Sequence, residues 1–466
     1  MVQTSRVESA GAANTNKRHP PRHLTQDAIG PTLIRMTLPM ILGMFVTFSF
    51  NLVDTFFVSM MGTEALSAIS FTFPVTFTMM SLAIGLSIGT SAVVAKYIGR
   101  GDMERAREAS TVTTYVAIAS AVVLAVIGYL FMEPIFRLLG APATLLPLIR
   151  EYMDIWLPTS ILLVAMVCGN AVLRANGDTR TPSWVMAGAG LVNAVFDPLL
   201  IFGWGPIPAM GMQGAALASL VSWLAAIGWL FYVLVIREQL IAPRLPSLAV
   251  FRSSSREMLK IGIPASGANM LTPVAAGVMT AIVASYGETA VAGFGVGSRL
   301  ETIACLIILA LSTTLPPLVS QNLGAGRLDR VEEACRLSMR FILGWQLLVY
   351  LLMVVCGPLI ARIFTDNAEV AAIIRLYLWI VPLSYGCQGI VILCNSALNA
   401  LHRPMIALYL SIARFFVFYV PLAWLGSSLY GLTGFFLGAL LGNVATALVS
   451  WVSFRQILAL EKRQQA

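Results

Sequence analysis

The feature that most constrains this chain is a succession of apolar stretches, each long enough to cross a lipid bilayer. The first, residues 34–62 (IRMTLPMILGMFVTFSFNLVDTFFVSMMG), would measure roughly 40 Å as a helix. Only 11% of all residues are charged, whereas soluble domains carry about 25%. Inside a bilayer every backbone polar group must be paired within the protein, and helices achieve this segment by segment. The sequence therefore predicts an all-α polytopic membrane protein.

Windows of about 20 apolar residues predict twelve transmembrane helices. The distribution of Lys and Arg sets their orientation, because positively charged loops stay in the cytoplasm. With the N-terminus inside, the inner segments hold 24 Lys and Arg residues and the outer loops hold four. We therefore expect both termini in the cytoplasm. The predicted spans are residues 33–60, 65–93, 110–133, 150–173, 183–203, 211–236, 259–285, 291–320, 338–361, 372–398, 404–426 and 431–455.

The second half of the chain repeats the first at an offset of 225 residues. Residues 86–109 (LSIGTSAVVAKYIGRGDMERAREA) align without a gap with residues 311–334 (LSTTLPPLVSQNLGAGRLDRVEEA). Each half has an even number of spans, so both halves share one orientation. The expected fold is two six-helix lobes related by a pseudo-two-fold axis along the membrane normal. The same offset pairs Pro39 with Pro264, Gly62 with Gly287, Arg137 with Arg362, Tyr152 with Tyr377, and Asn170 with Asn395.

The repeat divides the chain into five predicted parts. The two lobes are expected at 33–236 and 259–457, joined by a cytoplasmic linker at 237–258. Residues 1–32 are polar and basic and are expected to form a disordered cytoplasmic tail, with a second tail at 458–466. The net charge of +8 comes from loops and tails, so nucleic-acid binding is not expected. No GxxxxGK[ST] phosphate-binding loop occurs, which excludes a nucleotide-driven pump.

Polar residues inside the apolar spans of the first half are candidates for an ion site. A carboxylate at the bilayer centre costs about 2.5–3.5 kcal/mol, so Asp54 and Asp197 are functional candidates by default. Asn193 precedes Asp197 by four residues and shares its helix face, while Pro198 leaves a backbone carbonyl free one turn earlier. Counted along their helices, Asp54, Asp197 and Ser219 lie at a matched depth, about 12 Å below the outer surface. The set predicts an oxygen cage for Na⁺ or a proton relay; private hydrogen bonds that only stabilise packing are the alternative.

The second half does not repeat this chemistry. Met279 takes the place of Asp54, and Tyr419 takes that of Asp197 after a shift of three residues. The coupling site is therefore expected in the first lobe alone.

The second half has its own ionisable residues within the spans. Glu301 is expected to form a structural ion pair with Arg299 or Arg414. Methionine and aromatic side chains can repack around varied ligands, which suggests an adaptable substrate cavity. The candidate residues for lining this cavity are Met44, Phe48, Phe71, Phe73, Met279, Arg299 and Glu301.

Taken together, these motifs resemble the multidrug and toxic compound extrusion (MATE) family over residues 33–455. They are the two six-span repeats, NLVDTFFV, NAVFDPLLIFG, GAALAS, and SRLETIA followed by SQNLGAGR. Similarity to the bacterial DinF-like branch implies that Asp54, Asn193 and Asp197 face the first-lobe cavity. Ser219 stands where that branch has Thr, so it keeps an oxygen and loses a methyl group. The span-seven acid of the NorM-like branch is absent, which argues against a second-lobe cation site of that kind.

The resemblance implies a secondary antiporter of the bacterial inner membrane that exports amphipathic or cationic drugs or metabolites in exchange for H⁺ or Na⁺. Sodium, if it is the ion, would bind at Asp54, Asn193 and Asp197. A monomer without a cofactor is expected. Two alternatives stay open: a flippase for lipid-linked oligosaccharides, and a membrane-embedded transferase. No catalytic constellation is visible, so the chain is not expected to be an enzyme.

The predicted orientation can be tested with an impermeant thiol reagent applied to intact cells. A cysteine placed in the loop of residues 202–209 is expected to react, because that loop lies outside. A cysteine at residues 246–255 is expected to stay unlabelled until the cells are opened. The reverse pattern would invert the topology.

Overall fold

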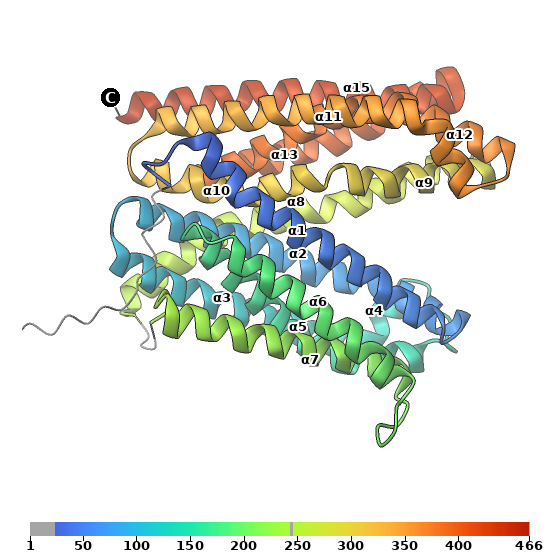
Figure 1. Ribbon diagram of the computed structural model, residues 1–466, viewed down its shortest axis with the longest axis horizontal. Coiled ribbons are helices and arrows are strands. Elements are labelled where there is room, and N and C mark those ends of the chain that lie inside the picture. The colour runs from blue at the N-terminus through green and yellow to red at the C-terminus, as the bar shows by residue number, and fades with distance from the viewer. Residues whose placement is uncertain (1–23, 243–245, 466) are drawn as a thin grey trace, which may run out of the picture.

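The computed structural model describes residues 24–242 and 246–465, and helices account for nearly all of them (Figure 1). The first lobe comprises α1 (Ile29–Ser59), α2 (Thr63–Gly99), α3 (Met103–Leu130), α4 (Met132–Leu138), α5 (Leu146–Ala175), α6 (Arg180–Ile201), α7 (Gly211–Phe231) and the π-helix η1 (Tyr232–Arg237). The second lobe comprises α8 (Leu248–Ala284), α9 (Glu288–Ala304), α10 (Leu306–Gly324), α11 (Leu328–Phe364), α12 (Ala368–Ile380), the 3₁₀ turn η2 (Val381–Ser384), α13 (Tyr385–Ala400), α14 (Pro404–Ala413), the π-helix η3 (Arg414–Tyr419) and α15 (Val420–Gln465).

The predicted all-α fold with twelve transmembrane segments is confirmed. Eleven helical stretches in the described ranges are apolar and long enough to cross a membrane. The last of them, residues 404–464, holds two spans, because the backbone leaves helical geometry at Tyr430 and Gly431. Two spans are themselves interrupted: α9 and α10 break at Cys305, and η2 separates α12 from α13.

Several helices extend beyond the predicted limits. Helix α1 starts at Ile29 inside the predicted tail, α8 starts at Leu248 inside the predicted linker, and α15 continues to Gln465. Apolar windows locate only the lipid-buried part of a helix, whereas charged residues continue the same helix into the interface. Residues 24–28 precede α1 and pack against the second lobe, while the rest of the predicted tail, 1–23, lies outside the described residues.

The repeat is visible in the backbone. Gly62 and Gly287 both have positive φ, at 113° and 96°, and each is the N-cap of the second span of its half. Glycine takes up this region without the steric cost that a Cβ atom imposes. The pairing at 225 residues therefore reflects a shared turn between the first two spans of each lobe.

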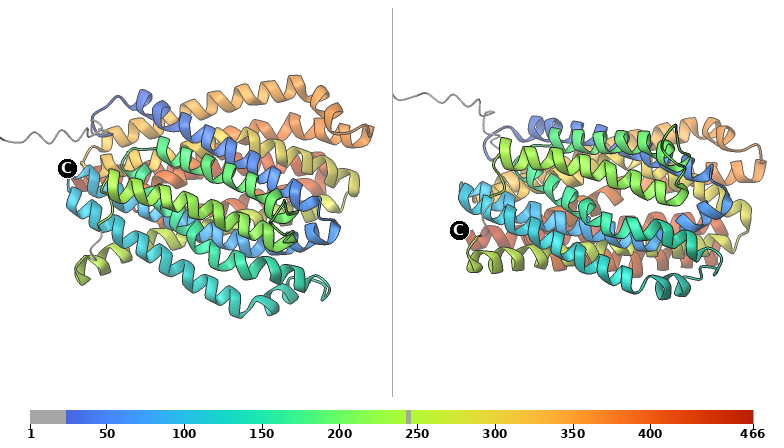
Figure 2. Two further views of the ribbon diagram at one scale, coloured as in Figure 1. Left: turned by 60° about the horizontal axis from the view of Figure 1, so that its bottom comes forward. Right: turned by 90° about the horizontal axis from the view of Figure 1, so that it is seen from below.

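The first helix of each lobe also packs against the other lobe. Helix α1 packs on α6 in its own lobe and on α10 in the second, while α8 packs on α2 and α14 (Figures 1 and 2). These crossings are equivalent under the repeat but differ in chemistry. Thr37 of α1 shares a 2.9 Å hydrogen bond with Thr314 of α10. The corresponding residues, Gly262 and Gly89, instead allow close backbone packing, since a Cβ on Gly89 would lie 3.2 Å from the Gly262 nitrogen.

The lobes meet most closely at the end of the bundle where the described chain begins and ends, here called the terminal end (Figure 1). Gly99 of α2 lies against the carbonyl of Gln321, and Gly324 of α10 lies against the carbonyl of Lys96. Gln321 also donates from Nε2 to the carbonyl of Ala175, at 2.7 Å. Lys96 and Gln321 are repeat partners, as are Gly99 and Gly324, so the crossing is symmetric about the pseudo-two-fold axis.

Residues 24–28 fasten α1 to the second lobe at the same end. Arg330 donates to the carbonyls of Leu24 and Asp27, and Asn322 donates to the Leu24 carbonyl at 3.2 Å. Arg327 donates to the Thr25 carbonyl at 2.7 Å. Leu24 itself is only 1% exposed. This segment is thereby held in place by two arginines at the start of α11 and by Asn322 near the end of α10.

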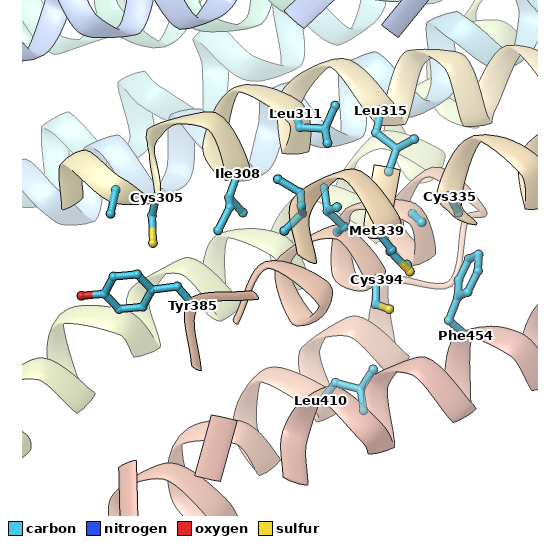
Figure 3. Packing of buried hydrophobic residues seen from close by; sticks show 14 of the residues in the cluster. Cys305, Ile308, Leu311, Leu315, Cys335, Met339, Tyr385, Cys394, Leu410 and Phe454 are labelled. Atoms are coloured by element: carbon cyan, nitrogen blue, oxygen red, sulfur yellow. The ribbon is translucent and has the colours of Figure 1, made fainter. Parts of the chain in front are cut away.

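One large apolar cluster is centred in each lobe. The first is built mainly on α2, α3 and α5 and includes Met258 and Ile261 of α8. The second is built mainly on α10, α11, α13 and α15 and includes Leu33 and Met36 of α1. Ile308, Leu311 and Leu315 of α10 point into the second cluster, and Tyr385 lies at its edge beside Cys305 (Figure 3). The first helix of each lobe therefore contributes to the apolar core of the other lobe.

The contribution of the α2–α10 crossing to the stability of the protein can be tested. Gly99→Ala or Gly324→Ala would place a methyl group against a backbone carbonyl that cannot turn aside, so each is expected to destabilise the protein by about 1–3 kcal/mol. The measurement is the thermal unfolding midpoint of purified protein. Gly344→Ala in α11 is the control, because a Cβ there would have no atom within 4 Å. Equal midpoints for all three variants would contradict the role given to the crossing.

Candidate functional site

The first-lobe candidates lie on two helices that pack together. Asp54 is near the end of α1, and Asn193 and Asp197 are on α6. Asp197 is 0% exposed, and its Oδ1 accepts a 3.2 Å hydrogen bond from Nδ2 of Asn193 one turn earlier. Pro198 follows directly and has no N–H to offer the Ala194 carbonyl, which adds an acceptor to the same stretch of α6.

The two carboxyl groups face each other. Asp54 and Asp197 lie within hydrogen-bonding range, so the structure brings together residues 143 positions apart in the sequence. The second oxygen of Asp197, Oδ2, is buried and has no N–H or O–H donor in the described chain. Two ionised carboxylates cannot share such a space cheaply at low dielectric. The arrangement is stable with a proton shared between them, or with a cation held by their oxygens.

Tyr152 of α5 is a third neighbour of the pair that the sequence reasoning did not assign to it. It lies close enough to interact electrostatically with both Asp54 and Asp197, and it packs beside Val58 and Ile201. A signal was available, because Tyr152 is one of the residues that recur at the repeat offset. A tyrosine kept inside an apolar span in both halves has an aromatic body to pack and a hydroxyl that needs a polar partner.

Ser219 is the fourth predicted member of the first-lobe site. It lies part-buried on α7, and its carbonyl accepts a 2.9 Å bond from Ser222. Its hydroxyl forms no hydrogen bond to Asp54, Asn193 or Asp197 in the part of the chain that the structure describes.

The proposed cavity residues divide into two sets. Phe48 and Phe73 are exposed, at 40% and 56%, and Met44 is part-buried. Phe71 packs against the first-lobe core, and Met279 is buried in the second-lobe core with 2% exposure.

The second lobe holds a different polar group. Tyr377 of α12 donates a 2.8 Å hydrogen bond to Oε2 of Glu301 on α9. Arg299 is exposed on another face of α9, and the Arg414 guanidinium lies 5.0 Å from the centre of the Phe415 ring. The ion pair expected between Glu301 and one of these arginines is wrong, since neither pairs with it among the described residues. The hydrogen-bond partner of the Glu301 carboxylate is Tyr377 and not an arginine.

The MatE family model matches residues 39–199 and 264–425, one segment in each lobe. The chain belongs to the MATE family. Members of this family are transporters, so the chain is a multi-pass membrane transporter of small molecules and not an enzyme. The two matched segments begin at Pro39 and Pro264, which are partners at the repeat offset.

Similar proteins include transporters of different stated substrates. A FAD transporter of Shewanella oneidensis is 39% identical over 440 residues, covering 94% of this chain and 97% of the relative. A protein described as a probable multidrug resistance protein of Bacillus subtilis, YpnP, is 28% identical over 88% of this chain and 92% of its own. The crystal structure of the Vibrio cholerae MATE transporter VcmN in its bent form superimposes with a TM-score of 0.89 and 33% identity, covering 93% of this chain and 98% of that one.

The carboxylate pair can be tested by removing one charge at a time. Asp54→Asn and Asp197→Asn are each expected to reduce transport at least about 100-fold, because a neutral amide can neither release a proton nor hold a cation. Membrane expression is expected to stay near that of the wild type, since the change removes a buried charge. Transport assays in cells and quantification of the protein in membranes are the measurements.

Asp154→Asn is the matched control. Asp154 is a partly exposed carboxylate on α5, 3.8 Å from Arg150, with no contact to the pair. It is expected to transport like the wild type. If both Asn variants did so as well, the pair would have only a packing role.

Proposed function

We propose that this transporter is a secondary active antiporter that couples export of amphipathic small molecules to the entry of a cation. Asp54, Asn193 and Asp197 form the coupling site. The observation that supports this best is the pair of facing carboxyl groups without a donor between them. A site of this kind needs a mobile positive charge, and an antiporter supplies one in every cycle.

The coupling ion in this proposal is H⁺, with Na⁺ as the alternative. A shared proton satisfies both carboxyl groups, and a substrate can compete with it for the same oxygens. Na⁺ would need more ligands, which Asn193 and the Ala194 carbonyl offer. One charge moved across about 180 mV supplies roughly 4 kcal/mol, enough for about a thousandfold gradient of a neutral substrate.

The α2–α10 crossing is the pivot for alternating access in this proposal. The excess of Lys and Arg in the loops on the terminal side supports a cytoplasmic location for both termini in a bacterial inner membrane. With that orientation, the close contacts between the lobes seal the cytoplasmic end. A monomer is sufficient, because the pseudo-two-fold axis relates two lobes of one chain.

Two substrate classes are candidates. Amphipathic cations, including drugs, suit the negative pair directly and agree with the names of several multidrug relatives. A flavin dinucleotide is the second candidate, because the FAD transporter is 39% identical over nearly the whole chain. Both classes combine an aromatic system with charge, and the sign of that charge separates them.

Purified protein in proteoliposomes tests the ion and the substrate together. Vesicles carrying an internal cationic dye or internal FAD are given either a pH jump without Na⁺ or a Na⁺ gradient at constant pH. Efflux of one substrate under the pH jump alone is expected. The Asp54→Asn protein is the control for leakage.

The outcomes are distinct. Efflux driven only by the Na⁺ gradient would overturn the proton assignment and leave the carboxylates as Na⁺ ligands. Efflux of FAD but not of the dye would select the flavin dinucleotide. Efflux that both gradients leave unchanged would contradict antiport.

A further inference from the structure

The exposed arginine of α9, Arg299, lies well inside a membrane span, and the proposed coupling site does not use it. It follows Gly287, the N-cap of α9, by twelve residues, which is roughly 18 Å of helix. Its side chain forms no hydrogen bond or ion pair with any residue that the structure describes. A cation at this depth is costly against lipid, so such residues face a partner or a water-filled space.

The side of α9 that packs against α12 is opposite to the side that carries Arg299. Gly297 lets α12 approach closely, because a Cβ atom there would overlap the ring of Tyr377. Glu301 lies on the same packed side and accepts its hydrogen bond from Tyr377. Residues two positions apart are separated by about 200° around a helix, so Arg299 points away from both Gly297 and Glu301.

The exposed side of α9 is not built like a surface for lipid. Arg299 shares it with Ala292, Gly295 and Thr302, which follow one another at helical spacing. A Cβ atom on Gly295 would have no atom within 4 Å, so there is free space one turn from Arg299. Helix α11, by contrast, exposes a stripe of large apolar side chains. That stripe includes Leu347, Leu351 and Val355. Figure 1 shows α9 on the side of the second lobe that is turned toward the first, so Arg299 faces the first lobe and not the lipid.

The first lobe presents an aromatic pair at the same depth. Phe73 and Phe77 of α2 correspond under the repeat to Ser298 and Thr302, the neighbours of Arg299 on α9. Because the pseudo-two-fold axis runs along the membrane normal, repeat partners lie at equal depth. Phe73 is 56% exposed, and its ring centre lies 5.6 Å from that of Phe77. One lobe therefore offers aromatic rings at the level where the other offers a cation.

We propose that Arg299 binds the phosphate of an aromatic anion whose ring system packs on Phe73 and Phe77 of the opposite lobe. The guanidinium fork matches two phosphate oxygens, and aromatic ligands stack on phenylalanine rings. The inference rests on the proposed export function and selects the second of its two substrate classes, the one that carries phosphate. The phosphate and the proton then bind to different lobes, so their exchange is coupled through movement of the lobes and not by competition for the carboxyl oxygens.

Equilibrium dialysis of the purified protein against FAD and against riboflavin tests this site. The two compounds share the flavin ring system, but only FAD carries phosphate. In Arg299→Gln the affinity for FAD is expected to fall at least about tenfold, because charge-assisted hydrogen bonds to phosphate are lost. The affinity for riboflavin is expected to stay unchanged. Arg299→Lys keeps the charge without the planar fork, and its affinity for FAD is expected to lie between those of the wild type and Arg299→Gln.

Two further variants separate the phosphate contact from the ring contact. Arg375→Gln is the matched control, because it removes an exposed arginine of α12 whose Nε donates to the Ala371 carbonyl of its own helix at 3.3 Å. It is expected to bind FAD like the wild type. Phe73→Leu is expected to weaken the binding of FAD and of riboflavin alike, by at least about threefold, because both ligands lose the same aromatic contact.

Each of four results would overturn the proposal. They are no binding of FAD by the wild type, equal FAD affinity in the wild type and Arg299→Gln, an equal loss of both flavins in Arg299→Gln, and unchanged flavin affinity in Phe73→Leu. Binding at equilibrium needs no ion gradient, so an affinity that depends on Arg299 would stand even if antiport failed in proteoliposomes. Its absence would leave the carboxylate coupling site untouched.

Discussion

The close crossing of α2 and α10 is the constraint on which the rest of this structure depends. Two glycines, Gly99 and Gly324, let each helix rest on a backbone carbonyl of the other. These backbone contacts bring the two helices close together, and the Gln321 side chain adds a hydrogen bond to the Ala175 carbonyl of the first lobe. In the proposed function this crossing is the pivot between the two lobes during alternating access.

Helix α1 connects this pivot to the carboxylate pair. Its first residues and the preceding segment are bound to the second lobe through Arg330, and Thr37 is bound to Thr314. Near its other end, Asp54 faces Asp197 on α6. In the proposed coupling, neutralising the two carboxylates would change how firmly α1 is held to the first lobe, while its opposite end stays attached to the second. Pro39 lies between the two attachments and interrupts the helical hydrogen bonds at a point where bending costs least.

A histidine lies in the seam between the lobes at the terminal end. His402, in the loop between α13 and α14, is part-buried beside the backbone of Ala92 in the other lobe. Burial, together with the nearby Lys96, Arg100 and Lys260, lowers the pKa of His402 to about 3. The imidazole is therefore neutral throughout the physiological range.

The sequence predicted what depends on position along the chain and missed what depends on the rotation of helices. Span number, repeat offset and the pairing of Asp54 with Asp197 followed from spacing, since matched depth is a one-dimensional property. Tyr152 was missed, because nothing in one span says which neighbour its hydroxyl will face. The Glu301 ion pair was wrong for the same reason: charge complementarity favoured arginine, but the packing of Gly297 against the Tyr377 ring brought a tyrosine to the carboxylate first.

The proposed single coupling site has an energetic consequence that depends on the charge of the substrate. When a monovalent cation leaves as one proton enters, no net charge moves, and the pH gradient alone drives export. A flavin dinucleotide carries about two negative charges on its phosphates, so its export moves charge in the same direction as proton entry. Three charges crossing about 180 mV would supply roughly 12 kcal/mol, about three times the work available from one. One mobile ion therefore suffices for either substrate class, and the membrane potential, without effect on the first exchange, would dominate the second.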